Sequence, residues 1–68
     1  MTKDIAQVLV PEGTSQEEKN DIKRELHRRG VKSNIQEDPN ISYSIKINYK
    51  SETYYAGNSR LIPENIKA

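Results

Sequence analysis

The sequence has no cysteine, no phenylalanine and no tryptophan, and it has a single histidine. Disulfides are therefore excluded, and so is the Cys/His zinc cluster that holds many small domains together. No run of apolar residues is long enough to cross a membrane, and the apolar stretch before Pro11 is shorter than the core of a signal peptide. We expect no membrane segment, and the lack of cysteine and of an export signal favours a cytoplasmic location.

Neither sign of charge dominates. Eleven Lys and Arg residues face ten Asp and Glu residues, which gives the chain a net charge of +1. A protein that coats DNA carries a larger positive excess because each phosphate contact needs a cation. The same balance excludes a polyanionic mimic of DNA.

The length predicts one small domain that spans residues 1–68. A chain of this size buries only about 60% of the surface that it exposes when unfolded, so its stability is marginal. With disulfides and zinc excluded, the remaining aids are consistent local structure and association with another chain.

Residues 5–10 predict the first strand. In strand geometry both of its faces are mostly apolar, which indicates cover on two sides. We therefore expect this strand to be central in its sheet or to lie at a subunit contact. Pro11 and the glycine that follows end it.

A helix is predicted over residues 15–29. Residues 14–18 contain two alternative capping boxes, and Gly30 suits a Schellman ending after the last turn. The only aliphatic residues of the helix are Ile22 and Leu26, one turn apart. A helix with so thin an apolar stripe should cover one face of a sheet and leave most of its own surface exposed.

The second half of the chain predicts three further strands. Residues 31–37 alternate weakly, and residues 38–40 form a turn. Residues 41–50 then alternate strictly between apolar and polar side chains, as in a half-buried antiparallel strand, and residues 53–57 return as a hairpin. For the second face of the first strand two possibilities remain open: the C-terminal tail from Leu61 to Ile66 covers it, or a partner does.

These elements predict an α+β fold. Their order is strand, helix, strand, strand, strand, and we expect a small sheet of three to four mostly antiparallel strands with one helix packed on one face.

The sequence offers no convincing catalytic or metal site. His27, the only histidine, lies on the predicted helix beside Arg28, where a solvated histidine is the plain interpretation. The carboxylates of Glu17, Glu18 and Asp21 have the spacing that is ordinary at the start of a helix. No glycine-rich phosphate loop is present, and so short a chain has little room for a water-excluding pocket. We expect no catalytic residue, metal ligand or cofactor, and no small-molecule substrate.

Basic side chains gather toward the predicted end of the helix. Compensation of the helix dipole and solubility explain such a cluster, whereas the functional interpretation is contact with a phosphate or an acidic partner. From this cluster we select Arg24, Arg28, Arg29 and Lys32 as candidate contact residues.

The polar face of the predicted hairpin is a second candidate surface. It carries Lys46 and Lys50, together with one of Tyr54 and Tyr55, because neighbours on a strand point to opposite faces. A solvated strand face is the plain interpretation. The functional alternatives are stacking of unpaired bases and contact with a protein.

We therefore predict a non-enzymatic interaction protein, a small regulator or inhibitor that acts as a homodimer by binding another macromolecule. A protein partner is favoured, since the small core should leave apolar surface or open strand edges for dimerisation or strand addition. The alternative is a nucleic-acid-binding protein that uses the same basic and tyrosine residues.

Overall fold

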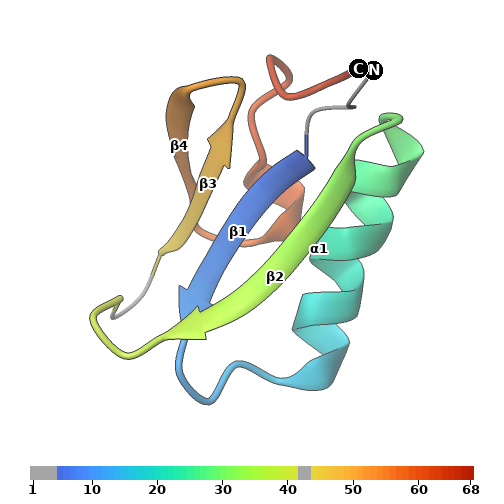
Figure 1. Cartoon of the computed structure of the whole chain (residues 1–68). Coiled ribbons are helices and arrows are strands. Elements are labelled where there is room, and N and C mark those ends of the chain that lie inside the picture. The colour runs from blue at the N-terminus through green and yellow to red at the C-terminus, as the bar shows by residue number, and fades with distance from the viewer. Residues whose placement is uncertain (1–4, 42–43) are drawn as a thin grey trace.

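The computed structural model of the chain describes residues 5–41 and 44–68, and it confirms the predicted α+β class (Figure 1). Its elements follow the predicted order: β1 (Ile5–Pro11), α1 (Gln16–Arg28), β2 (Lys32–Asp38), β3 (Ile45–Tyr49), β4 (Glu52–Ala56) and a short 3-10 helix, η1 (Ser59–Leu61). The four strands form one sheet in the order β2-β1-β3-β4. Among the described residues, no helix combines the length and the apolar composition needed to cross a membrane.

Strand β1 is central, which is one of its two predicted positions, but described elements cover only one of its faces. It runs parallel to β2, with Val8 opposite Ile35, and antiparallel to β3, with Val8 opposite Ile47. Its side chains alternate: Val8 is fully buried under α1, whereas Ile5 on the other face is 50% exposed. The parallel pairing of β1 and β2 follows from their connection, because a helix that crosses over the sheet returns the next strand in the same direction.

Local signals at both ends of α1 are satisfied as the sequence predicts. The Ser15 hydroxyl accepts a hydrogen bond from the N–H of Glu18 at 3.1 Å, which caps the first turn. At the other end Gly30 adopts a φ of +79°, and the N–H of Val31 donates to the carbonyl of Leu26 at 2.9 Å. This is the Schellman ending, which needs the left-handed conformation that glycine adopts without steric cost.

Strand β3 is shorter than the predicted strand over residues 41–50. Alternation shows which side chains can face the core, but a strand extends only where a neighbour pairs with it. Strand β4 pairs along Ile45–Tyr49 and β1 pairs with the middle of that segment. Ile41 lies outside any strand, and the predicted strand positions 42–43 lie outside the described residues.

The hairpin between β3 and β4 closes through a two-residue loop, Lys50-Ser51. Both residues are left-handed, with φ of +51° and +66°. Such turns usually take Asn-Gly, because glycine and asparagine tolerate positive φ. The sequence lacks that signal, so it does not indicate the length of this loop.

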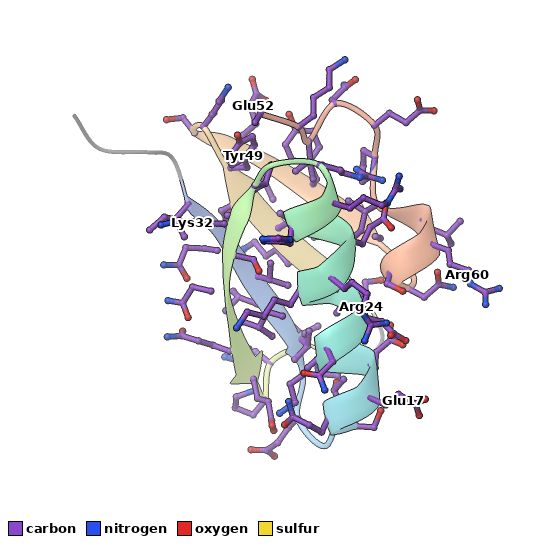
Figure 2. The ribbon with its side chains drawn as sticks, turned by 90° about the vertical axis from the view of Figure 1, so that its right-hand side faces the viewer. Glu17, Arg24, Lys32, Tyr49, Glu52 and Arg60 are labelled. Carbon is purple, nitrogen blue, oxygen red and sulfur yellow. The ribbon has the colours of Figure 1, made fainter. Side chains whose placement is uncertain are left out.

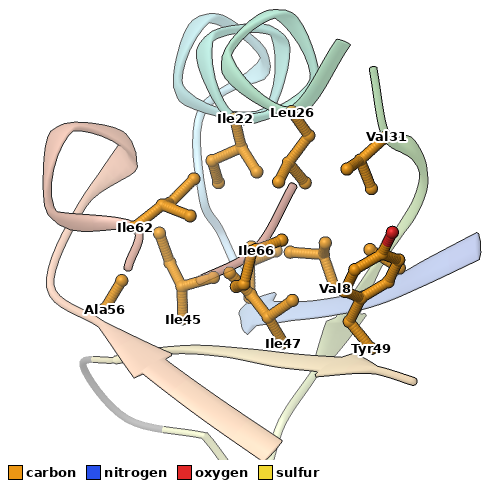
Figure 3. Packing of buried hydrophobic residues seen from close by; sticks show 12 residues of the cluster. Val8, Ile22, Leu26, Val31, Ile45, Ile47, Tyr49, Ala56, Ile62 and Ile66 are labelled. Atoms are coloured by element: carbon orange, nitrogen blue, oxygen red, sulfur yellow. The ribbon is translucent and has the colours of Figure 1, made fainter. Parts of the chain in front are cut away.

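The hydrophobic core lies between the sheet and α1, and the C-terminal tail completes it (Figure 3). Ile62 and Ile66 are buried among the side chains of α1, β1 and β3. After β4 the side chain of Asn58 accepts a hydrogen bond from the N–H of Arg60 at 2.8 Å, and η1 then contacts α1. The possibility that the tail covers the second face of β1 is therefore wrong, because the chain turns back onto the helix side.

Candidate interaction surfaces

One face of the sheet is covered by α1 and the tail, and no described element packs on the other, which we call the open face. Strand alternation and the pairing register determine its members. These are Ile5, Gln7, Leu9 and Pro11 of β1, Lys32, Asn34, Gln36 and Asp38 of β2, Lys46 and Asn48 of β3, and Thr53 and Tyr55 of β4. In Figure 2, Lys32 projects from the sheet on the side away from α1.

The centre of the open face is amphipathic. Leu9, Lys46 and Tyr55 lie directly opposite one another on three neighbouring strands. Tyr55 is 64% exposed, whereas Lys46 is half-buried because its aliphatic stem lies between two large neighbours. In the adjacent row, Thr53 donates a hydrogen bond to the Asn48 side chain at 2.8 Å. The face therefore presents apolar, cationic and amide groups side by side.

The structure places the predicted hairpin residues in three different environments. Tyr54 lies opposite Ile47, is half-buried and packs against the core. Tyr55 stands on the open face beside Lys46. Lys50 lies in the hairpin loop, with its Nζ 5.3 Å from the centroid of the Tyr49 ring. The prediction that one of the two tyrosines joins the core is confirmed.

The predicted basic cluster is divided between two sides of the molecule. Arg24 pairs with Asp21 at 3.2 Å and Arg28 with Glu25 at 2.6 Å, and both arginine side chains are mostly exposed on α1. The hydrogen bond from Arg28 lowers the pKa of the Glu25 carboxyl. Lys32 lies on the open face instead. Arg24 and Arg28 therefore cannot share one flat contact surface with Lys32, and their contact with a partner stays a prediction.

Arg29 is bound within its own chain. Its Nη1 donates to the carbonyl of Pro63 at 2.6 Å and, at 3.3 Å, to that of Ile66, and its Nη2 donates to the carbonyl of Ile62 at 3.0 Å. Its Nε donates to Glu25 at 3.0 Å, and the side chain is only 15% exposed. We therefore assign Arg29 a structural role, which is to hold the tail against α1. Sequence reasoning missed this role because the carbonyls lie more than thirty residues further along the chain.

A shallow groove runs between α1 and β2, and sequence reasoning did not identify it. It consists of two adjoining hollows of about 330 and 210 Å³ that share Lys23 and Ser33. The other lining residues are Gln16, Lys19, Asn20, His27, Val31, Lys32, Asn34 and Ile35. None of these described lining residues is acidic, so the groove is basic.

Three carboxylates of the described surface, those of Asp21, Glu25 and Glu37, form ion pairs. Lys19 Nζ donates to Glu37 at 2.6 Å and the N–H of Gly13 donates to it at 3.2 Å, and these contacts lower the pKa of the Glu37 carboxyl. Within residues 5–41 and 44–68, no three His, Asp or Glu side chains gather as metal ligands. The hydrogen bonds of Glu37 with Lys19 and Gly13 hold β2 and the start of α1 in place.

Comparison with protein-family models, with curated proteins and with solved structures found no match to this chain.

Proposed function

We propose that this protein is a non-enzymatic interaction module, a small regulator or inhibitor that binds another protein through the open face of its sheet. The observation that carries the proposal is the difference between the two faces of β1. The helix and the tail cover Val8 and its neighbours, whereas Ile5 and Leu9 lie on a face that no described element covers. The proposal keeps the homodimer and the cytoplasmic location that the sequence favours.

The open face indicates the chemistry of the partner. Among the described residues of this face, two are cations, Lys32 and Lys46, and one is a carboxylate, Asp38, which lies at the end of β2. Tyr55 adds an amphipathic ring of the kind that is enriched at protein interfaces. These groups suit a mildly acidic surface of another protein that offers an apolar side chain for Tyr55.

A comparison of two equally exposed side chains tests the proposal. Tyr55 on the open face is 64% exposed and Leu61 of η1, away from that face, is 62% exposed. In affinity capture from nuclease-treated lysate of the native host, we expect Tyr55→Ala to lose a protein that the unmodified chain and Leu61→Ala both retain. Equal retention by the two variants contradicts a protein partner on the open face. A capture that is seen in untreated lysate but is lost after nuclease treatment contradicts it as well.

A nucleic-acid partner is the second candidate, because an exposed Tyr55 beside Lys46 can stack a base and hold the adjacent backbone. Fluorescence anisotropy with single-stranded DNA and RNA oligonucleotides tests it. Binding that falls steeply with salt and is lost in both Tyr55→Ala and Lys46→Glu favours this alternative, whereas no binding at low salt rejects it.

A further inference from the structure

The outer edge of β2 is an open strand edge. Within the described residues β2 pairs only with β1, and its outer side carries the unpaired N–H and C=O groups of alternate residues. Such an edge accepts another strand unless something blocks it. At seven residues, β2 is long enough to form a stable ladder with a partner.

The sequence of β2 is complementary to itself in the antiparallel direction. When two copies of the strand Lys32–Asp38 pair about its central residue, Ile35, each Lys32 lies opposite Asp38 of the other copy. Asn34 then lies opposite Gln36, which pairs two amides. We propose that the protein forms a two-fold symmetric homodimer through this pairing, in which the two sheets join into one continuous sheet.

The helix side of β2 supports the same register. Ile35 is half-buried at the edge of the sheet, and pairing with Ile35 of the second copy covers the rest of its side chain. The hydroxyl of Ser33 is buried and has no hydrogen-bond partner among the described residues. In the dimer Ser33 lies opposite Glu37 of the second copy, whose carboxylate can accept its hydrogen bond.

Charge in the groove between α1 and β2 also suits this partner. Lys23 lines both hollows of the groove beside Ser33 and has no acidic partner within 4 Å among the described residues. The dimer brings Glu37 of the second copy to the Ser33 position, which places a carboxylate in a basic groove. Lys19 of the groove already pairs with Glu37 of its own chain, so the charge that Glu37 of the second copy meets is that of Lys23.

The other edge of the sheet lacks this complementarity. Antiparallel self-pairing of β4 about Tyr54 places Glu52 opposite Ala56 and Thr53 opposite Tyr55. That arrangement forms no pair of opposite charges, and β4 has only five residues. The charges therefore favour β2 as the dimer edge.

The dimer deepens the homodimer part of the proposed function and forms at the outer edge of β2, where Lys32 and Asp38 also border the open face. One open face is small: four strands at about 4.8 Å spacing and about 20 Å in length give a projected area of roughly 400 Å². A standard protein interface buries about 800 Å² from each partner. Edge pairing places two open faces next to each other, which supplies an area of that size.

Charge reversal at the two ends of β2 tests the proposal. Lys32→Asp places two acidic residues opposite each other at both ends of the paired β2 strands, and Asp38→Lys places two lysines there. By analytical ultracentrifugation we expect each single variant to raise the dissociation constant of the dimer roughly tenfold to hundredfold. A mixture of the two variants should regain the original affinity as a heterodimer, because both ends then carry opposite charges. Such a rescue shows that the single variants are folded and that the two residues contact each other across the paired β2 strands.

Glu52→Lys on the β4 edge is the matched control, and we expect it to leave the dissociation constant unchanged. The proposal is overturned if the unmodified chain is a monomer at millimolar concentration, if both single variants dimerise as it does, or if the mixture gains nothing over its components. Tyr55→Ala should retain the dimer, so failure of the dimer and failure of the open-face proposal give different results.

Discussion

Replacing Arg29 with methionine should release the C-terminal tail and destabilise the whole domain. Methionine keeps an apolar stem of similar reach but removes the guanidinium, which donates three hydrogen bonds to the carbonyls of Ile62, Pro63 and Ile66 and one to Glu25. Those carbonyls belong to the segment that carries two buried core residues. Loss of the donors therefore affects the packing of the core as well as the surface.

The size of the effect follows from the number of hydrogen bonds and their burial. A hydrogen bond contributes about 1 kcal/mol net, so four of them from a side chain that is 15% exposed give a loss of about 3–4 kcal/mol. A domain of 68 residues has a free energy of unfolding of roughly 3–10 kcal/mol. The substitution should therefore remove a large fraction of the total stability.

Urea unfolding followed by far-UV circular dichroism measures this loss, with Arg28→Met as the control. Arg28 contacts the same Glu25 oxygen at 2.6 Å, but its side chain is 71% exposed, so we expect little change in the free energy of unfolding. Hydrogen exchange adds a local readout, because the N–H of Ala68 donates to the carbonyl of Arg29 and should lose protection when the tail is released. Equal destabilisation by the two substitutions would refute the structural role of Arg29.

Three further predictions concern stability. The loop substitutions Lys50→Asn and Ser51→Gly together should raise the free energy of unfolding by about 1–2 kcal/mol, since both positions have positive φ, and urea unfolding measures the gain. The hydrogen bond from Lys19 lowers the pKa of the Glu37 carboxyl, so the ionised carboxylate stabilises the fold above the ordinary pKa of 4.5, and this stability is lost as the pH falls through the lowered pKa. The urea midpoint should therefore drop between neutral pH and pH about 3, and it should drop less in Glu37→Gln. Ile66→Ala should cost about 2–5 kcal/mol by thermal unfolding, because this tail residue is fully buried, and a smaller loss would show that the tail is dispensable.

Sequence reasoning succeeded where structure follows from near neighbours. The cap at Ser15 and the Schellman ending at Gly30 depend on residues within one or two turns of the helix, and both are confirmed. The alternation of β1 predicted which side chains share a face, but both faces are mostly apolar, so it did not predict which of them meets the core. Arg29 acts on carbonyls more than thirty residues away, and no local pattern can indicate that contact.

The candidate surfaces required the register of the sheet. Alternation predicted that Tyr54 and Tyr55 point in opposite directions, but only the pairing of Tyr54 with buried Ile47 shows which of them is exposed. The edge position of β2 was equally hidden, because chain order does not determine sheet order. Its free edge and the groove beside α1 became visible only when the strands were assembled.

The division of each strand into two sets of side chains separates folding from recognition. Ile47 faces the core, and its neighbour Lys46 faces outward beside Leu9 and Tyr55. Substitutions at the outward positions should alter what the sheet binds at little cost in stability, whereas substitutions at inward positions should affect folding first. A library that varies only the outward set should therefore yield many folded variants with new specificities, and natural selection can use the same freedom.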